Sequence, residues 1–250
     1  MNEAWLAQLR EREDGSWWHR VLRRMVVEEL RRRLPDGSRL IDAGCGTGGL
    51  LAEFRRQRVP WQVAGFDLSG EAVRLVRERG FTAVQRAEVE SIPWPDGSLE
   101  AVVCLDVLDQ ESVDEQLAVT ELGRVLRPGG LLIVHVPASE SLQGCAGSFP
   151  GSVRRYSPGR LRALFPEESW RIDLLHGWNA IGYPWARLWR WLRGPRQGPW
   201  GPVGRSAAVS DFLASLGSCD AAGCRALRLG WGTSLLLVAT KAGGTVPPVP

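Results

Sequence analysis

Lysine is almost absent from this chain of 250 residues: Lys241 is the only one, and arginine carries nearly all of the positive charge. The net charge of +3 at pH 7 is too small to indicate a nucleic-acid partner. No apolar run approaches the ~20 residues that a membrane-spanning helix requires. The stretch MNEAWLAQLREREDGS at the N-terminus is too charged for a secretion signal. We therefore predict a cytoplasmic protein that does not bind nucleic acid.

Regularly spaced cysteines are also lacking, because the five cysteines are scattered along the chain. Their odd number and irregular spacing indicate reduced thiols. Cys219 and Cys224 have no further cysteine and histidine pair nearby to complete a zinc site. We therefore expect no metal.

What is present is an alternation of short apolar runs with amphipathic stretches. Strands are predicted at 39–44, 61–69, 81–87, 99–107 and 131–138, with helices at 48–57, 69–80 and 112–126 between them. This alternation predicts an α/β fold with a doubly wound, mostly parallel sheet. One or two arginine-rich helices are expected before it, over 4–33.

The pattern is less regular after residue 139. A short helix at 157–165, a strand at 169–177, a helix at 207–216 and a last strand at 232–241 are predicted there, followed by a disordered tail. We divide the chain into an N-terminal helical cap (1–36), a core (37–141) and the C-terminal half of the same domain (142–250). That last part contains a tryptophan-rich insertion at 178–229.

Glycine is concentrated where the first predicted strand meets the following helix. Gly44, Gly46 and Gly48 form G-x-G-x-G, and Gly49 also permits the G-x-G-x-x-G spacing of dinucleotide-binding folds. Glycine permits a left-handed backbone and lets a ligand lie against bare main chain. The glycines therefore predict a nucleoside cofactor without choosing which one.

Two acidic residues distinguish between the cofactors. Asp42 ends the first strand, where a carboxylate attracts an ammonium group and repels a pyrophosphate. Asp67 ends the second strand, where an acid can accept both ribose hydroxyls. A ribose with a cationic tail describes S-adenosylmethionine better than NAD, so a nicotinamide oxidoreductase is the disfavoured alternative.

Four segments, LIDAGCGTGG, GFDLS, AEVESIPWPDGSLEAVVCLDVL and ELGRVLRPGGLLIVHVP, resemble the successive motifs of class I S-adenosylmethionine-dependent methyltransferases. The flanking segments WWHRVLRRMV, VRRYSPGRLRALF and GWNAIGYPWARLWRWLRG resemble a bacterial subgroup that methylates small molecules or glycans. The resemblance implies a seven-stranded Rossmann-like sheet with helices on both faces and the last strand antiparallel. It also implies S-adenosylmethionine as the cofactor and S-adenosylhomocysteine as the product.

The resemblance assigns cofactor-binding residues by position. Those implied at the methionine end and the ribose are Asp42, Gly44, Cys45, Gly46 and Asp67. Those implied beside the adenine are Leu68, Glu88 and Val89, and those implied near the sulfonium are Cys104, Leu105 and Asp106.

Residues that could serve the acceptor are sparser. The subgroup commonly has a Glu-His pair after the fourth strand, where this chain has Asp109 and Gln110, so a histidine base is lacking there. The candidates for a base are Asp109, Asp106 and Tyr156, and the candidates for acceptor contact are Arg154, Arg155, Tyr156 and His19. His135, inside an apolar strand, is expected to be a core histidine.

These residues predict O-methylation of a small-molecule or glycan acceptor, including a lipid-linked one, by in-line displacement. The missing histidine motivates an alternative, a non-catalytic module that binds S-adenosylmethionine or S-adenosylhomocysteine. The tryptophan- and arginine-rich segment predicts either a helix lying on an anionic membrane surface or a lid over the acceptor pocket. The sequence gives no prediction of oligomeric state.

Overall fold

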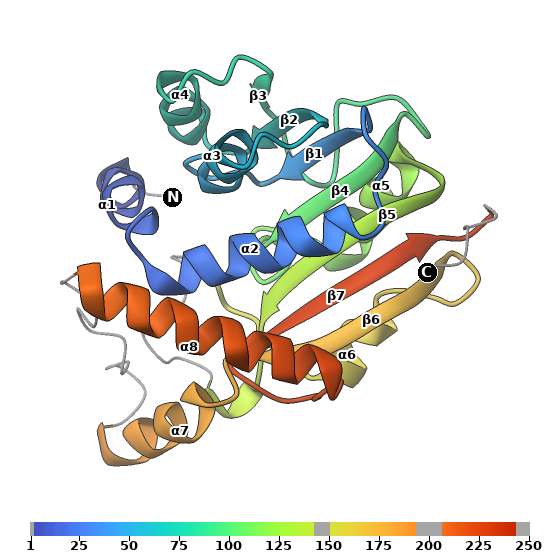
Figure 1. The fold of residues 1–250 in the computed structure, drawn as a ribbon. Coiled ribbons are helices and arrows are strands. Elements are labelled where there is room, and N and C mark those ends of the chain that lie inside the picture. Colours follow the sequence, from blue (N-terminus) through green and yellow to red (C-terminus); the bar gives the residue numbers. More distant parts are fainter. Residues whose placement is uncertain (1–2, 143–150, 194–206, 244–250) are drawn as a thin grey trace.

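The computed structural model describes residues 3–142, 151–193 and 207–243, which form one sheet with helices on both faces (Figure 1). The strands are β1 (Arg39–Ala43), β2 (Gln62–Asp67), β3 (Val84–Arg86), β4 (Leu99–Leu105), β5 (Leu126–Pro137), β6 (Trp170–Trp178) and β7 (Ser234–Lys241). The helices are α1 (Glu3–Glu13), α2 (Trp17–Arg31), α3 (Gly49–Arg56), α4 (Gly70–Glu78), α5 (Glu115–Val125), η1 (Glu140–Leu142), α6 (Pro158–Ala163), α7 (Gly182–Arg193) and α8 (Ala207–Ala226).

The described part of the sheet has seven strands in the order β3-β2-β1-β4-β5-β7-β6. All neighbouring pairs are parallel except the two that β7 makes with β5 and β6. The predicted fold class is therefore confirmed, including the antiparallel last strand. The strand order reverses between β1 and β4, and open α/β sheets bind their ligands outside the carboxyl ends of the strands at such a point.

The two faces of the sheet bury separate apolar clusters. The helices α2, α3 and α8 cover one face, where Val26, Phe54 and Ala214 pack on the strands. The helices α5 and α6 cover the other face with Leu122 and Leu161. Strands buried on both sides account for the continuous apolar runs in the sequence.

Helix starts follow the local signals, and the largest differences from the predicted bounds are in α8 and β5. Ser69 caps α4 by accepting a hydrogen bond from the Ala72 amide, as its position predicted. The predicted helix at 207–216 continues as α8 to Ala226, because small residues let it approach α2: a Cβ on Gly217 would lie 3.0 Å from the Trp17 ring. β5 begins at Leu126, which pairs with Leu99, so the last residue of the predicted helix at 112–126 and residues 127–130 after it lie within the strand.

Some sequence predictions fall beyond the described residues. The predicted disordered tail, residues 242–250, lies outside them from residue 244 onward, and residues 143–150 and 194–206 also lie outside them. The proposed division into cap, core and C-terminal half remains a prediction. None of the described helices combines the length and the apolar character needed to cross a membrane.

The joint between β6 and the segment before β7 leaves no room for a side chain at Gly177. A Cβ there would lie 2.2 Å from the Trp231 backbone oxygen, whereas a Cβ on Gly223 in α8 would meet nothing within 4 Å. We expect Gly177→Ala to lower the free energy of unfolding by ~2 kcal/mol or more. Gly223→Ala should raise it by about 1 kcal/mol, because alanine favours the helix. Urea titration followed by circular dichroism measures both, and shifts of the same sign would contradict this packing.

Candidate functional site

The glycine-rich bend between β1 and α3 is fastened to the end of β2. The amides of Gly44 and Cys45 both donate to the Phe66 carbonyl oxygen at 2.9 Å. Gly44 has a φ of +76°, and a Cβ on it would lie 2.4 Å from a methyl carbon of Val107. Gly46 has a φ of +52°, but a Cβ there would meet no atom within 4 Å. Gly44 is thus required by packing, whereas Gly46 presents bare backbone to open space.

Asp67 holds the same bend through its side chain. One carboxylate oxygen accepts from the Gly46 amide at 2.9 Å, and the other accepts from the Ser69 amide at 2.8 Å. Burial raises the pKa of Asp67, and these two hydrogen bonds act in the opposite direction. The carboxylate therefore lies beside the half-buried backbone of Gly46, where the sequence predicted a ribose.

Asp42 is the second acid at this edge, and it is 3 % exposed. Burial, together with the negative charges of Asp67 and Glu13, raises its pKa to about 8. A cationic ligand group beside it would favour the ionised carboxylate and lower the pKa. The pair of buried acids around a bare glycine therefore fits a nucleoside with a cationic tail and does not fit a pyrophosphate.

Glu13, which the sequence analysis missed, occupies the start of α3. Its carboxylate accepts a hydrogen bond from the Thr47 hydroxyl and pairs with Arg79 at 2.7 Å, and Arg23 donates to its backbone oxygen at 2.6 Å. A Cβ on Gly49 would lie 2.4 Å from both Glu13 and Arg23. The last glycine of the motif thus makes room for the protein's own ion cluster, where a dinucleotide fold would place a pyrophosphate.

No local signal marks Glu13 in the sequence. It lies in the charged stretch EREDGS, which reads as solvated surface, and it becomes buried only because α1 and α2 fold over α3. Burial raises its pKa even though Thr47, Arg23 and Arg79 lower it.

The end of β4 carries Asp106 in a left-handed conformation, with a φ of +54°. Its carboxylate lies 2.9 Å from Nδ1 of His135, and Nε2 of His135 accepts a hydrogen bond from the Trp178 indole at 3.0 Å. Because an indole N–H can only donate, Nδ1 carries the proton that His135 donates to Asp106. His135 is buried as predicted, and it also fixes the orientation of Asp106.

His19 comes from α2 to the same group of side chains. The Trp18 ring packs edge-on against His19 and His135, with centroid distances of 5.0 and 5.4 Å. Burial lowers the pKa of His19 to about 4, and the Arg23 charge adds to this effect, so the ring is neutral at pH 7. The predicted acceptor contact thus has a neutral imidazole close to Asp106.

Asp109 is a buried acid three residues after Asp106 in the chain. Burial and the charge of Asp106 raise its pKa to about 6, although a hydrogen bond with Ser152 acts in the opposite direction. Among the described residues, nothing donates a hydrogen bond to its Oδ1 atom. A buried carboxylate with a raised pKa and a vacant acceptor atom is suited to taking a proton.

The loop after β5 is tied down by the residues predicted to meet the acceptor. Tyr156 is fully buried and donates its hydroxyl to the Leu108 carbonyl at 2.8 Å, and burial raises its pKa well above the usual range. Arg154 donates to the Gln110 carbonyl, and Arg155 donates to a backbone carbonyl at 2.8 Å. These side chains hold the loop in place. Because the Tyr156 hydroxyl is buried and bonded to the main chain, Tyr156 is not suited to act as a base.

The residues predicted around the adenine lie farther along the edge. Leu68 and Glu88 are exposed, whereas Val89 is buried. Cys104 is fully buried within the sheet, and burial raises the pKa of its thiol, so it acts as a small apolar residue there. Leu105, the last residue of β4, packs partly buried on the opposite face.

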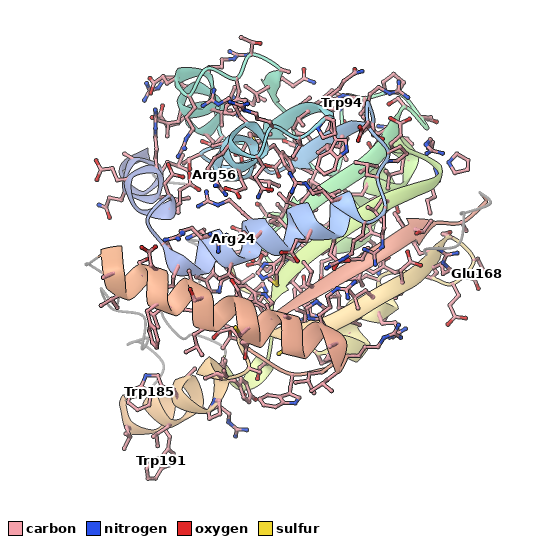
Figure 2. The ribbon with its side chains drawn as sticks, in the orientation of Figure 1. Arg24, Arg56, Trp94, Glu168, Trp185 and Trp191 are labelled. Atoms are coloured by element: carbon pink, nitrogen blue, oxygen red, sulfur yellow. The ribbon has the colours of Figure 1, made fainter. Side chains whose placement is uncertain are left out.

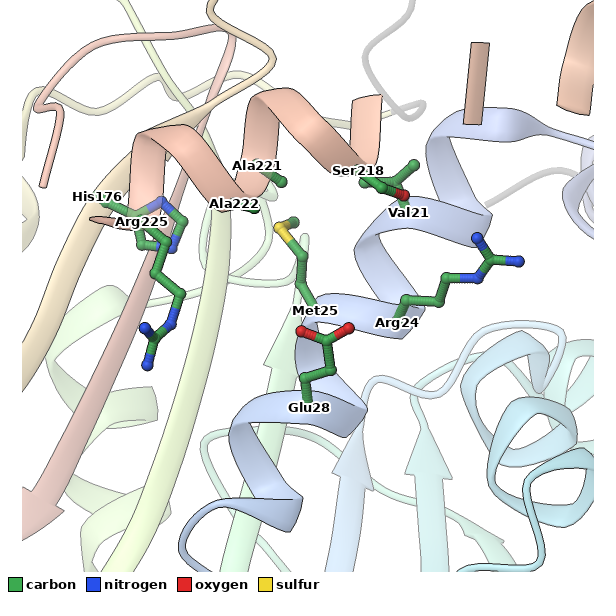
Figure 3. A pocket seen from close by; sticks show the side chains of 9 residues that line it. All are labelled: Val21, Arg24, Met25, Glu28, His176, Ser218, Ala221, Ala222 and Arg225. Atoms are coloured by element: carbon green, nitrogen blue, oxygen red, sulfur yellow. The ribbon is translucent and has the colours of Figure 1, made fainter. Parts of the chain in front are cut away.

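A separate hollow lies between α2 and α8 (Figure 3). Met25 and Glu28 of α2, Ser218 and Arg225 of α8, and His176 of β6 contribute to its wall. None of the residues predicted for the cofactor or the acceptor lines it.

Part of the chain is similar to known methyltransferases. Residues 41–134 match the family described as methyltransferase domain. The malonyl-[acyl-carrier protein] O-methyltransferase of Enterobacter lignolyticus is 33 % identical over 127 residues, which are 50 % of this chain and 49 % of that protein. The tRNA (carboxymethyluridine(34)-5-O)-methyltransferase ALKBH8 of Mus musculus is 32 % identical over 127 residues, 50 % of this chain and 18 % of that protein.

Solved structures support the fold over a longer stretch. A methyltransferase in complex with the Haloferax volcanii Trm112 methyltransferase activator superposes with a TM-score of 0.63 and 17 % identity, covering 96 % of this chain and 97 % of that chain. The chain spans less than two thirds of the length of the curated relatives named above. The matched segment, residues 41–134, contains the acid-flanked glycine bend and is identified as a class I S-adenosylmethionine-dependent methyltransferase domain.

Proposed function

We propose that the chain transfers a methyl group from S-adenosylmethionine to an oxygen atom of a small-molecule or glycan acceptor. The observation that carries the proposal is the bare backbone of Gly46 between two buried acids, Asp42 and Asp67. When bound, S-adenosylmethionine supplies a methyl group that is already activated on a positively charged sulfur. The protein then has to bind, align and exclude water.

Each side chain of the bend has a distinct task in this proposal. Asp67 accepts the ribose hydroxyls, and Asp42 accepts the ammonium group of the methionine portion. Gly46 offers main chain without a side chain, so the ligand can lie against it. The ion cluster of Glu13 closes the start of α3 to a competing diphosphate.

On the acceptor side, Asp109 takes the proton of the attacking hydroxyl. His135 donates to Asp106 and holds that carboxylate at the end of β4, so His135 is a positioning residue. Burial and the charge of Asp106 together raise the pKa of Asp109 to about 6, which suits a base that works near neutral pH.

The net charge of the chain, the contacts of two arginines and the names of the two relatives reported above all bear on the class of the acceptor. Both curated relatives are named as O-methyltransferases, one for an acyl-carrier protein and one for a tRNA. Arg154 and Arg155 bond backbone carbonyls of this chain instead of standing out to bind phosphates. The net charge of +3 is also small for an RNA-binding protein. These observations favour a small molecule or a glycan over RNA.

Removing the ribose acceptor tests the cofactor assignment. Asp67→Asn should weaken binding of S-adenosylhomocysteine by roughly tenfold or more, because a charged acceptor of two hydroxyls is lost. Isothermal titration calorimetry measures the affinity, and circular dichroism checks the fold. Asp96→Asn, at an exposed acid paired with Arg124, is the matched control and should bind like the wild type. Unchanged affinity in Asp67→Asn would overturn the assignment.

Cofactor binding should release a proton near pH 7. Asp42 has a pKa of about 8 before the ammonium group arrives and a lower one afterwards, so the carboxyl ionises on binding. The affinity for S-adenosylhomocysteine should therefore rise as the pH rises from 6 to about 8. Calorimetry in two buffers of different ionisation enthalpy counts the protons. Asp42→Asn should abolish this release, and an equal release from the variant would refute the role of Asp42.

The proposed base should appear in the pH dependence of turnover. Asp109 must be ionised to accept a proton, so the rate of S-adenosylhomocysteine formation should fall as the pH falls below about 6. Asp109→Asn should lower the rate by about a hundredfold and remove this acidic limb. Glu111→Gln, at an exposed neighbour, is the control that keeps both. The assay uses labelled S-adenosylmethionine with a metabolite fraction as the acceptor source. A retained limb in Asp109→Asn would exclude Asp109 as the base.

A further inference from the structure

One segment of the chain has a higher net positive charge than the whole chain. Residues 174–210 contain five arginines and no acidic residue. That segment therefore carries +5 against +3 for the whole chain, which leaves −2 for all other residues. A segment of this kind is complementary to an extended anionic surface.

Within this segment, α7 exposes an apolar face. Ile181, Trp185, Leu188 and Leu192 follow the spacing i, i+4, i+7 and i+11, which places them on one side of a helix, and all four are exposed. Trp191 lies next to this stripe and is 81 % exposed. Figure 2 shows Trp185 and Trp191 projecting from α7 at the outer edge of the molecule.

The opposite side of α7 is held by the rest of the protein. Ala186 is buried against Leu142 of η1, and the Tyr183 hydroxyl lies 3.1 Å from the Ser139 hydroxyl. At the inner end, Asp220 of α8 accepts from the amides of Ala180 and Ile181 at 3.1 and 3.0 Å. The apolar stripe thus faces away from the protein on a helix whose orientation is fixed.

We propose that α7 docks on an anionic lipid bilayer, with the stripe of Ile181, Trp185, Leu188 and Leu192 in the headgroup region and the net positive charge of this part of the sequence attracting the helix to the lipid phosphates. Tryptophan favours this interfacial depth, and a basic amphipathic helix binds there through apolar burial plus attraction to anionic lipid. The aliphatic members of the stripe favour a bilayer over RNA, because RNA binds through a basic groove and aromatic stacking and gains little from exposed leucine or isoleucine.

The position of α7 gives docking a consequence for the reaction. The helix packs on η1, which follows the carboxyl end of β5. It therefore lies near the edge formed by the carboxyl ends of the parallel strands, where the candidate site also lies. A docked α7 brings that edge to the membrane surface, where it can meet a lipid-linked acceptor. This consequence rests on the proposed function, whereas the docking itself does not.

Vesicle flotation tests the proposal. The probes are vesicles of phosphatidylcholine alone and vesicles with roughly 30 % phosphatidylglycerol. The wild type should float with the anionic vesicles only, and less so as salt is raised. The triple variant Trp185→Ser, Leu188→Ser, Trp191→Ser should lose roughly tenfold or more of this binding. The control is Leu117→Ser on α5, whose side chain is 56 % exposed on the other face of the sheet, and it should float like the wild type.

Several results would overturn the docking proposal. The first is that the triple variant binds anionic vesicles as well as the wild type does, and the second is that the wild type does not float. The third is that the triple variant loses tRNA binding or self-association but keeps vesicle binding. Calorimetry with S-adenosylhomocysteine is run on the same three proteins. Absent flotation with intact cofactor binding overturns only the docking, and absent cofactor binding in the wild type overturns only the proposed function.

Discussion

The site depends on how the end of β2 holds the bend that follows β1. The Phe66 carbonyl accepts the amides of Gly44 and Cys45, and the Asp67 carboxylate accepts the amide of Gly46. These bonds require the left-handed backbone that glycine adopts without strain. They also bring Asp42 and Asp67 to one edge, where the charge of Asp67 contributes to the raised pKa of Asp42. A cationic nucleoside is the ligand that such an edge stabilises.

The N-terminal helices complete this arrangement from outside the sheet. Arg23 and Arg79 bind Glu13 over the start of α3, and Trp18 packs on the His135 ring that orients Asp106. One helical cap therefore contacts both the cofactor bend and the proposed acceptor side. The shape of the candidate site therefore also depends on residues of the N-terminal helices, which lie outside the matched segment 41–134.

Much of this could be predicted from local pattern. Strand and helix periodicity gave the sheet, and the offsets of Asp42 and Asp67 from the glycines gave the acid pair. Local pattern did not reveal features with a tertiary cause: Glu13 is buried in a stretch of charged residues, and α8 continues through Gly217, where α2 lies against it. His135 was predicted as core, but its link to Asp106 depends on a strand pairing that periodicity does not reveal.

The most direct measurement is a crystal structure of the chain with S-adenosylhomocysteine bound. The account predicts the ribose hydroxyls on the Asp67 carboxylate, the ammonium group beside Asp42 and the ligand lying across Gly46. Density for the ligand at another part of the molecule, or a bend at Gly46 closed by the protein's own side chains under saturating ligand, would contradict it.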